Sequence, residues 1–375
     1  MRSAVGNRVF SSGHGSPGVT EDGAPAESVA VPGARAAVRD AAAPDPLAVA
    51  QATRPSWGGR LSRAAALASV AMAVPDNVVS NATVAEGAGV TEQWIIHRTG
   101  VRERRHVTPG ERLSDLAVAA GRGALEEATV DPEEVDMVLV ATLAADELTP
   151  NAAPIVAHEL GAHRAGTMDV GAACTGYLSA LSLAAAQIEC GRCENVLVIG
   201  ADVMSRFVDK RDRGTAALFA DGAGATLATA ADDAGGRIGH IALHADGLGA
   251  PAIWATHEEK VIHMQGHDTF KAAVHRLSES TLETIEQAGL ELDDIGLFVY
   301  HQANARILAA VGEKLGIQPE RVIDCIDRYG NTSSATLPIA MADARERGML
   351  EPGMNVVLAA FGAGFTWGAG VIQWG

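Results

Sequence analysis

Two pairs of segments in this chain of 375 residues recur at one constant offset. The run NVLVIG (195–200) resembles NVVLAA (355–360), and LEEATVDPEEVDMVLV (125–140) resembles IEQAGLELDDIGLFVY (285–300). The two offsets are the same, since 355 − 195 = 160 and 285 − 125 = 160. A repeat of this length, called the repeat offset below, indicates two copies of one α/β unit rather than a solenoid of short units.

Each copy is expected to alternate buried strands with helices. The runs MVLVAT, NVLVIGA, LFVYH and NVVLAAF are short, apolar and uninterrupted, which is typical of strands covered on both faces. Helix-like segments separate them, so the sequence predicts mostly buried sheets flanked by helices. We expect ordered structure to begin near Ala64 and to comprise an N-terminal half over 60–228 and a C-terminal half over 229–375.

The segment 1–59 differs from the rest of the chain in composition. It is rich in Ala, Gly, Pro, Ser and Val and shows no sustained period, which predicts a disordered extension over 1–59. It lacks the pattern of a signal peptide. A misassigned translation start explains the segment equally well.

Charge and cysteine content exclude several classes of function. The formal net charge of −17 argues against general binding to nucleic acids and to anionic membrane surfaces. No apolar run is long enough for a transmembrane helix. The four cysteines are too few for a disulfide scaffold, and the lone C-x-x-C of Cys190 and Cys193 lacks the second ligand pair of a structural zinc site. We expect no metal, two cysteines at a helix end, and a cytoplasmic location.

Cys174 lies in DVGAACTGYLSALSLAAAQIECG, where a strand-like segment leads through small residues into a long apolar helix. A thiol at a helix N-terminus is close to the positive end of the helix dipole and to free backbone N–H groups. Both favour the nucleophilic thiolate. Taken alone, a buried structural cysteine explains the residue equally well.

His301 ends the strand-like run LFVYH, and Asn331 lies in the turn GNTSSATLP, where Ser333 or Ser334 is expected to cap the following helix. The carboxyl ends of buried strands are where ligands bind in α/β folds. The repeat offset also relates GAACTG to NTSSAT, so a pseudo-twofold fold would bring the two segments together. By themselves, a core histidine and a turn asparagine explain these two residues better.

Six segments between about residue 64 and the C-terminus carry a resemblance to a known family. They are TEQWIIHRTGVRERR (91–105), DVGAACTG (169–176), DRGTAALFADGAGA (212–225), HQANARI (301–307), GNTSSATLP (330–338) and FGAGFTWG (361–368). In this order they strongly resemble β-ketoacyl-acyl-carrier-protein synthase III, the initiating condensing enzyme of type II fatty acid synthesis. The resemblance implies an α/β fold of the thiolase type, five-layered αβαβα from two duplicated halves, and a homodimer.

The mechanism that this resemblance implies uses Cys174, His301 and Asn331. Cys174 would take an acyl group from acyl-CoA as a thioester. His301 and Asn331 would bind the thioester carbonyl of malonyl-acyl-carrier protein and stabilise the enolate that forms as carbon dioxide leaves. The backbone N–H groups of Cys174 and Ala363 would form an oxyanion hole for the acyl carbonyl. No cofactor is implied beyond these two substrates.

The resemblance also implies contacts with CoA. Trp94 and Arg206 would hold the adenine between them, and Arg98 would reach the nucleotide phosphates. Asn304 and His267 would contact the pantetheine arm. The family commonly has Asn at the position of His267, so this residue is a departure.

The resemblance also implies residues that would contact the carrier protein and the acyl chain. Lys271, Arg306 and Lys314 would form a basic patch for the acidic acyl carrier protein. In the loop TLAADELTPNAAP, Thr149 stands where some members place a bulky aromatic that limits the partner subunit's acyl pocket, so a longer or branched chain could enter. Trp254, in a shortened stretch that lines the mouth of the site in relatives, could compensate.

Three alternative functions remain open at this point. A relative that transfers an acyl group to a hydroxyl, an amine or a carrier protein without decarboxylation would not need both His301 and Asn331. A biosynthetic thiolase is disfavoured because FGAGFTWGAG lacks the second cysteine that such enzymes use. A non-catalytic scaffold partner usually lacks the nucleophile, whereas Cys174 is present. The sequence defines neither the primer acyl group nor the choice between primary fatty acid and secondary polyketide synthesis.

Overall fold

Two β-sheets organise the part of the chain that the computed structural model describes, residues 63–231 and 236–375. The first described element is β1 (Ala64–Ala73), which lies at the apolar run where ordered structure was expected to begin. The disorder predicted for 1–59 lies outside the described residues.

The first sheet contains β1 and four further strands, and its order is β1-β7-β6-β4-β5. Parallel pairs join β4 to β5 and to β6, whereas β7 runs antiparallel between β6 and β1. The strands β4 and β6 are almost wholly buried because helices cover both faces. The bounds are β4 (Met137–Ala141), β5 (Gly166–Val170), β6 (Asn195–Val203) and β7 (Asp221–Ala231).

The second sheet consists of β8 (Arg237–Ala245), β11 (Ile295–Tyr300), β12 (Asn355–Gly362) and β13 (Thr366–Gln373). Its order is β11-β12-β13-β8, with one parallel pair followed by two antiparallel pairs. The run β4-β6-β7-β1 of the first sheet has the same sequence of pairings. Both sheets therefore place the carboxyl ends of two parallel strands at one edge.

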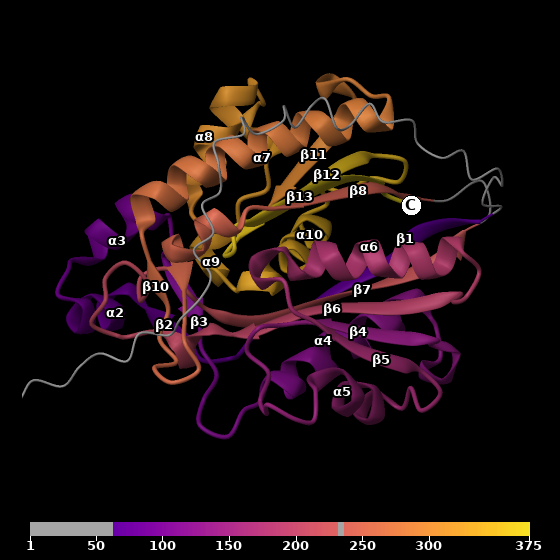
Figure 1. Ribbon diagram of the computed structural model, residues 1–375, viewed down its shortest axis with the longest axis horizontal. Helices are drawn as coiled ribbons and strands as arrows, with labels where there is room; N and C mark the ends of the chain where they lie inside the picture. Colours follow the sequence, from indigo (N-terminus) through magenta and orange to yellow (C-terminus); the bar gives the residue numbers. More distant parts are fainter. Residues whose placement is uncertain (1–62, 232–235) are drawn as a thin grey trace, which may run out of the picture. The chain divides into compact units, whose positions relative to one another are not determined.

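Helices form three layers around the two sheets (Figure 1). The first sheet has α4 (Leu113–Ala128) and α5 (Ala152–Leu160) on its outer face. Between the sheets lie α6 (Gly176–Glu189) and α10 (Thr336–Glu346), and α10 is buried along nearly its whole length. The second sheet is covered by α7 (Gly266–Ala288) and α8 (Ala305–Leu315). The chain is thus a mixed α/β fold whose central helices are surrounded by protein.

Shorter elements surround these layers. They are β2 (Val78–Ser80), α2 (Asn81–Ala88), α3 (Glu92–Thr99), β3 (Glu103–Arg105), β9 (Ile253–Trp254), β10 (His263–Met264) and α9 (Ile326–Tyr329). The 3-10 helices are η1 (Pro132–Glu134), η2 (Ala173–Thr175), η3 (Met204–Phe207), η4 (Gly247–Ala252), η5 (Leu292–Asp294), η6 (Pro319–Arg321) and η7 (Ser333–Ala335). Within the described residues, no helix is both long enough and apolar enough to span a membrane.

The repeat offset found in the sequence reappears in the bounds of these elements. It separates the starts of η1 and η5 (292 − 132 = 160), of η2 and η7 (333 − 173 = 160), and of β6 and β12 (355 − 195 = 160). The 3-10 helices η2 and η7 contact each other, and each leads directly into one of the two central helices. Segments far apart in the sequence therefore meet between the sheets, where the candidate site lies.

Candidate active site

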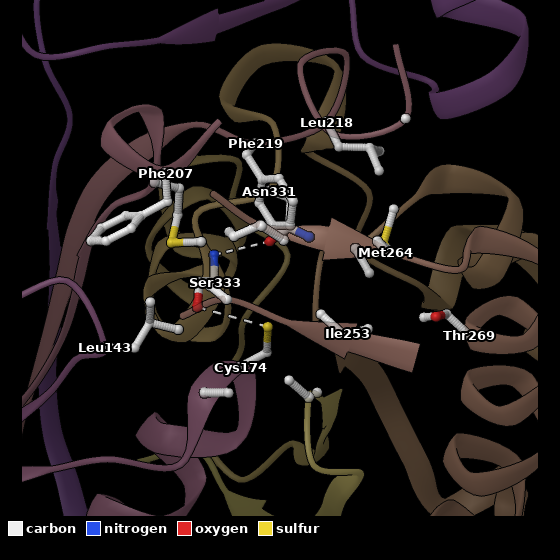
Figure 2. A pocket seen from close by; sticks show the side chains of 18 of the residues that line it. Leu143, Cys174, Phe207, Leu218, Phe219, Ile253, Met264, Thr269, Asn331 and Ser333 are labelled. Atoms are coloured by element: carbon white, nitrogen blue, oxygen red, sulfur yellow. Dashed lines mark hydrogen bonds between the residues drawn. The ribbon is translucent and has the colours of Figure 1, made fainter. Parts of the chain in front are cut away.

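One cavity receives side chains from both sheets. It encloses about 1230 Å³, and Cys174, His301 and Asn331 all line it. Figure 2 shows Cys174, Asn331 and Ser333 turned toward one another in this cavity, beside a wall of apolar side chains such as Ile253. The structure therefore brings together the three residues that the sequence singled out, although they are up to 157 positions apart (331 − 174 = 157).

Cys174 is the middle residue of η2 and stands at the start of α6. The turn is entered through Ala173, whose φ of 46° is uncommon for a residue with a side chain. A methyl group on Gly362 would lie 2.9 Å from the backbone N of Cys174 and 3.0 Å from its Cβ. The end of β12 can approach the nucleophile this closely only because glycine occupies that position.

Burial favours the thiol form of Cys174, against the thiolate expected from its place at a helix N-terminus. Cys174 is half-buried as a residue, but its sulfur is shielded from solvent, and this burial raises the pKa of the thiol to about 12. The Sγ donates a hydrogen bond to the Ser333 hydroxyl at 3.7 Å, which lowers the pKa but does not offset the burial. Desolvation therefore outweighs the effect of the helix N-terminus at this site.

His301 follows the last residue of β11 and is fully enclosed. Its backbone N–H donates to the Ala359 carbonyl at 2.8 Å, and its Nδ1 lies 2.6 Å from the Thr336 hydroxyl. Burial lowers the pKa of His301 to about 3. The ring is therefore neutral at physiological pH, and Nε2 is the ring nitrogen left for a ligand.

Asn331 is fixed by both its backbone and its side chain. Its N–H donates to the Leu218 carbonyl at 2.9 Å, and its own carbonyl accepts from Ala220 N–H at 2.9 Å. The side-chain Oδ1 accepts from the backbone N–H of Ser333 at 2.9 Å. This hydrogen bond orients the amide, and Figure 2 shows its nitrogen turned away from Ser333.

The sequence predicted that Ser333 or Ser334 caps α10, but neither serine does so. The N-cap of α10 is Ala335, which has no side-chain cap hydrogen bond. Ser334 instead donates its backbone N–H and its hydroxyl to Asp202, at 3.0 and 2.7 Å. Ser333 contacts the nucleophile and Asn331. The serines therefore stabilise the site rather than the helix.

The predicted oxyanion hole has one geometric support. Ala363 lines the cavity next to Gly362, the residue in contact with Cys174. Thr366 donates its hydroxyl to the Ala363 carbonyl at 3.1 Å and accepts a hydrogen bond from Thr175 at 2.9 Å. These contacts hold the segment after β12 against η2, while the oxyanion hole itself stays a prediction.

An aromatic and basic cluster also lines the cavity. The guanidinium groups of Arg98 and Arg213 lie 5.9 and 5.6 Å from the centre of the Trp94 ring. Arg206 lines the same cavity, but it forms an ion pair with Asp146 at 2.8 Å and does not stack on Trp94. The predicted adenine sandwich stays a prediction. Arg213, in the DRGT segment, was missed as a cation of this cluster.

The two residues predicted to contact pantetheine both line the cavity. Asn304 also caps α8, since its Oδ1 accepts from Arg306 N–H at 2.9 Å while its amide nitrogen donates to the Arg98 carbonyl at 3.1 Å. His267 lies in the first turn of α7. Asn304 thus joins the predicted pantetheine region to α3, which carries Trp94.

The predicted carrier-protein patch is exposed. Lys271 lies on α7, and Arg306 and Lys314 lie on α8, which packs against α7. Arg306 lines the cavity and lies 5.4 Å above the Phe270 ring. Of the three predicted residues, Arg306 is the one that lines the cavity, and the carrier-protein surface stays a prediction.

Thr149 is exposed and does not line the cavity of its own chain, although its neighbours Glu147 and Leu148 do. Its predicted effect on a partner's acyl pocket is untested. Trp254 lines the cavity and stacks on His263 at 4.1 Å, as part of the small β9–β10 sheet. The expectation that it stands at the mouth is consistent with this position.

The C-x-x-C motif lies at the end of α6, as predicted. Cys190 is the C-cap residue of α6 and is exposed, whereas Cys193 is buried. All four cysteines are free. Among the described residues, no three His, Cys, Asp or Glu side chains are grouped as metal ligands.

The chain is similar over most of its length to one group of enzymes. The family model for 3-oxoacyl-[acyl-carrier-protein (ACP)] synthase III matches residues 168–247, and the model for the C-terminal part of that enzyme matches 285–374. The beta-ketoacyl-[acyl-carrier-protein] synthase III of Roseiflexus sp. is 41% identical over 324 residues, which cover 83% of this chain and 98% of the relative. A second relative, synthase III 2 of Streptomyces coelicolor, is 42% identical and covers 84% and 95%.

Solved structures give the same result. The crystal structure of 3-oxoacyl-[acyl-carrier-protein] synthase III from Aquifex aeolicus superposes with a TM-score of 0.80 at 36% identity, over 83% of this chain and 100% of the other. The priming β-ketosynthase of the R1128 polyketide pathway also superposes with a TM-score of 0.80, at 35% identity over 84% and 97%.

Proposed function

This chain belongs to the β-ketoacyl-[acyl-carrier-protein] synthase III family, and we propose that Cys174, His301 and Asn331 carry out its reaction. It is an acyltransferase whose condensation initiates fatty acid or polyketide synthesis. The observation that carries the assignment of residues is that these three side chains line one cavity.

In the first half-reaction, Cys174 Sγ attacks the thioester carbonyl of an acyl-CoA. A bond forms between Sγ and the acyl carbon, the bond from that carbon to the CoA sulfur breaks, and the thiol proton ends on CoA. Because burial keeps Cys174 protonated, the proton has to leave as the new bond forms. Two backbone N–H groups, those of Cys174 and Ala363, stabilise the oxyanion, and loss of one such donor typically costs roughly 3–4 kcal/mol.

In the second half-reaction, His301 Nε2 and the Asn331 amide donate to the thioester carbonyl of malonyl-acyl-carrier protein. Carbon dioxide leaves, and the electron pair of the broken bond enters an enolate. Its nucleophilic carbon attacks the acyl carbon on Cys174, the bond from that carbon to Sγ breaks, and the thiolate takes up a proton to restore the thiol. Both donors are uncharged, since burial keeps His301 neutral. Neutral donors suit a buried enolate, whereas a carboxylate in place of Asn331 would repel it.

The carriers of the two substrates would bind at the mouth of the cavity. Trp94 and the surrounding guanidinium groups suit a purine with phosphates, and Arg213 adds a cation to this set. Asn304 and His267 would contact the pantetheine arm. The exposed basic patch would attract the acidic carrier protein despite the net charge of −17, because charge recognition is local.

The chain would act as a homodimer of the five-layered thiolase fold. Strand β5 is a sheet edge whose first three residues are exposed, and Met168 on it is 49% exposed. An unpaired edge with exposed apolar groups favours pairing with a second chain. The equal pairings of the two sheets and the repeat offset support two duplicated halves. The cytoplasmic location is proposed because all four cysteines are free.

The experiment is to mix the protein with acetyl-CoA and malonyl-acyl-carrier protein and to follow carbon dioxide and the carrier-protein product by mass. We expect one carbon dioxide for each 3-ketoacyl product, with transient acylation of Cys174. Acylation without carbon dioxide would favour plain acyl transfer instead. A folded sample that is never acylated would indicate a scaffold. A panel of longer and branched acyl-CoA primers then defines the acyl pocket.

A further inference from the structure

Asp202 is a buried carboxylate to which the proposed reaction gives no role. It lies in β6, and none of its surface is exposed. Within the described residues, the influences on its pKa include hydrogen bonds but no neighbouring cation. A carboxylate buried without a counter-ion is costly, so its presence beside an active site calls for a physical reason.

Donors from two loops hold the carboxyl group. Its Oδ1 accepts from the Thr142 hydroxyl and from Leu143 N–H, both at 2.9 Å. Its Oδ2 accepts from Ser334 N–H at 3.0 Å and lies 2.7 Å from the Ser334 hydroxyl, for whose single proton the Ala141 carbonyl competes at 2.8 Å. Burial raises the pKa of Asp202, and these hydrogen bonds oppose that shift only in part. Asp202 therefore ties the loop after β4 to the turn η7.

The turn that Asp202 holds also contacts the nucleophile. Ser333, next to Ser334, has a φ of 54°, a conformation that a residue with a side chain rarely adopts. Its hydroxyl accepts the 3.7 Å hydrogen bond from the Cys174 thiol, and its N–H donates to Asn331 (Figure 2). The hydrogen bonds to Asp202 thus stabilise a strained turn on which both catalytic side chains rest.

The sulfur depends on this turn for its hydrogen bond. Burial is the largest influence on the pKa of Cys174, and the Ser333 hydrogen bond lowers that pKa. A displacement of the Ser333 turn is therefore expected to change the reactivity of the thiol.

We propose that Asp202 is a positioning residue for the nucleophile, which fixes the Ser333–Ser334 turn so that the Ser333 hydroxyl stays against the Cys174 sulfur. The proposal rests on Cys174 being the nucleophile of the proposed function, but its test does not require turnover.

The test is the pH profile of Cys174 alkylation by iodoacetamide, followed by peptide mass spectrometry so that the other cysteines do not interfere. Asp202→Asn keeps the shape of the side chain and removes its charge. Asp221→Asn is the matched control, since Asp221 is equally buried and accepts from Val107 N–H and from the N–H and hydroxyl of Ser205. Circular dichroism and thermal melting check that each variant is folded.

We expect Asp202→Asn to lower the alkylation rate of Cys174 several-fold at pH 8 and to move the profile to higher pH, because an amide cannot accept from donors at both of its ends and the Ser333 turn is no longer held against the sulfur. A shift to lower pH would contradict the proposal. Asp221→Asn should lose comparable thermal stability, because it too leaves buried donors without their acceptor, yet keep the profile of the parent chain. Coinciding profiles for the parent and the two variants would overturn the proposal.

A second variant has the same expected sign and decides the matter if Asp202→Asn does not fold. Ser333→Ala removes the hydroxyl that lowers the pKa of the thiol, so alkylation should slow several-fold and the profile should move to higher pH. An unchanged profile would show that Ser333 does not link the turn to the sulfur, and the proposal would fall. If acyl-CoA never acylates the parent chain, the proposed function fails, but these alkylation profiles still decide the role of Asp202.

Discussion

The turns η2 and η7 occupy equivalent places at the repeat offset, yet they use their side chains in different ways. Each is entered through a residue with positive φ, Ala173 at 46° and Ser333 at 54°, and each leads into a central helix. In η2, Cys174 is half-buried and faces the cavity. In η7, the equivalent Ser334 is enclosed and donates to Asp202.

The two turns therefore have different tasks. The turn η2 places the reactive sulfur in the cavity, whereas η7 holds other residues in place. The Ser333 N–H orients Asn331. The Thr336 hydroxyl lies 3.1 Å from the Ser333 carbonyl oxygen and 2.6 Å from His301 Nδ1, to which it donates when Nε2 carries the ring proton. We infer that η2 serves the acylation half-reaction and that η7 serves decarboxylation. Each prediction below tests this division.

The largest effect is expected at the nucleophile itself. Cys174→Ala should reduce acylation by acyl-CoA by at least about 10³-fold, because no other side chain can form the thioester. Intact-mass spectrometry after incubation with acetyl-CoA measures this. Cys190→Ala is the control. Cys190 is exposed at the other end of α6, so its replacement should leave acylation by acyl-CoA unchanged. Equal loss in both variants would place the acyl group elsewhere.

A smaller loss, confined to one half-reaction, is expected at Asn331. Asn331→Asp puts a negative charge where an enolate forms, so condensation should slow by roughly 10²–10³-fold. Acylation of Cys174 should remain within a few-fold of the parent chain. Rapid-quench mass spectrometry separates the two steps. Equal slowing of both would mean that Asn331 supports η2 as well as η7.

Two glycines allow each turn to be displaced separately. A methyl group on Gly362 would contact Cys174 N at 2.9 Å, whereas one on Gly200 would contact the Ser334 carbonyl oxygen at 2.5 Å. Each change to Ala should cost about 1–3 kcal/mol of stability, as overpacking does. Gly362→Ala should slow acylation more, and Gly200→Ala should slow decarboxylation more. Gly171→Ala meets no atom within 4 Å and is the control in melting and kinetic assays.

The smallest effect is a pH dependence of stability. Burial lowers the pKa of His301 from 6.5 to about 3, so below pH 6.5 the unfolded chain binds a proton that the folded chain does not. The contribution of His301 to the free energy of unfolding therefore decreases as the pH is lowered from 6.5 to 3, by up to about 1.4 kcal/mol per pH unit. Denaturant unfolding should show that the free energy of unfolding decreases less from pH 7.5 to pH 5.5 for His301→Gln than for the parent chain. Equal losses would mean that His301 is not held neutral.

Much of this site follows from the sequence, because ordered motifs fix which residues meet. Cys174, His301 and Asn331 reach one cavity as predicted, and the apolar run at Ala64 forms the strand β1. The thiolate predicted for Cys174 was wrong because the prediction considered only its position at a helix N-terminus. Burial of the sulfur, which raises the pKa of the thiol, depends on the whole fold. The role of Asp202 was missed for the same reason.

The local patterns that failed show why. Ser334 was predicted to cap a helix, since serine before a helix usually does. Its partner Asp202 is separated from it by 334 − 202 = 132 positions, and only the packing of the two sheets reveals the contact. Arg213 was missed because a cation in a loop has no pattern that ties it to Trp94. Contacts between distant segments, rather than helices and strands, are what the sequence left undetermined.

The most direct test of the division between the two turns is decarboxylation of malonyl-acyl-carrier protein by the Cys174→Ala variant in the absence of any acyl-CoA. Cys174→Ala leaves His301 and Asn331 in place, so carbon dioxide should still be released, with acetyl-carrier protein as the product, while a Cys174→Ala/Asn331→Asp double variant should release almost none. If carbon dioxide release by Cys174→Ala falls to the level of the double variant, the two half-reactions share one machinery and the division between η2 and η7 is contradicted.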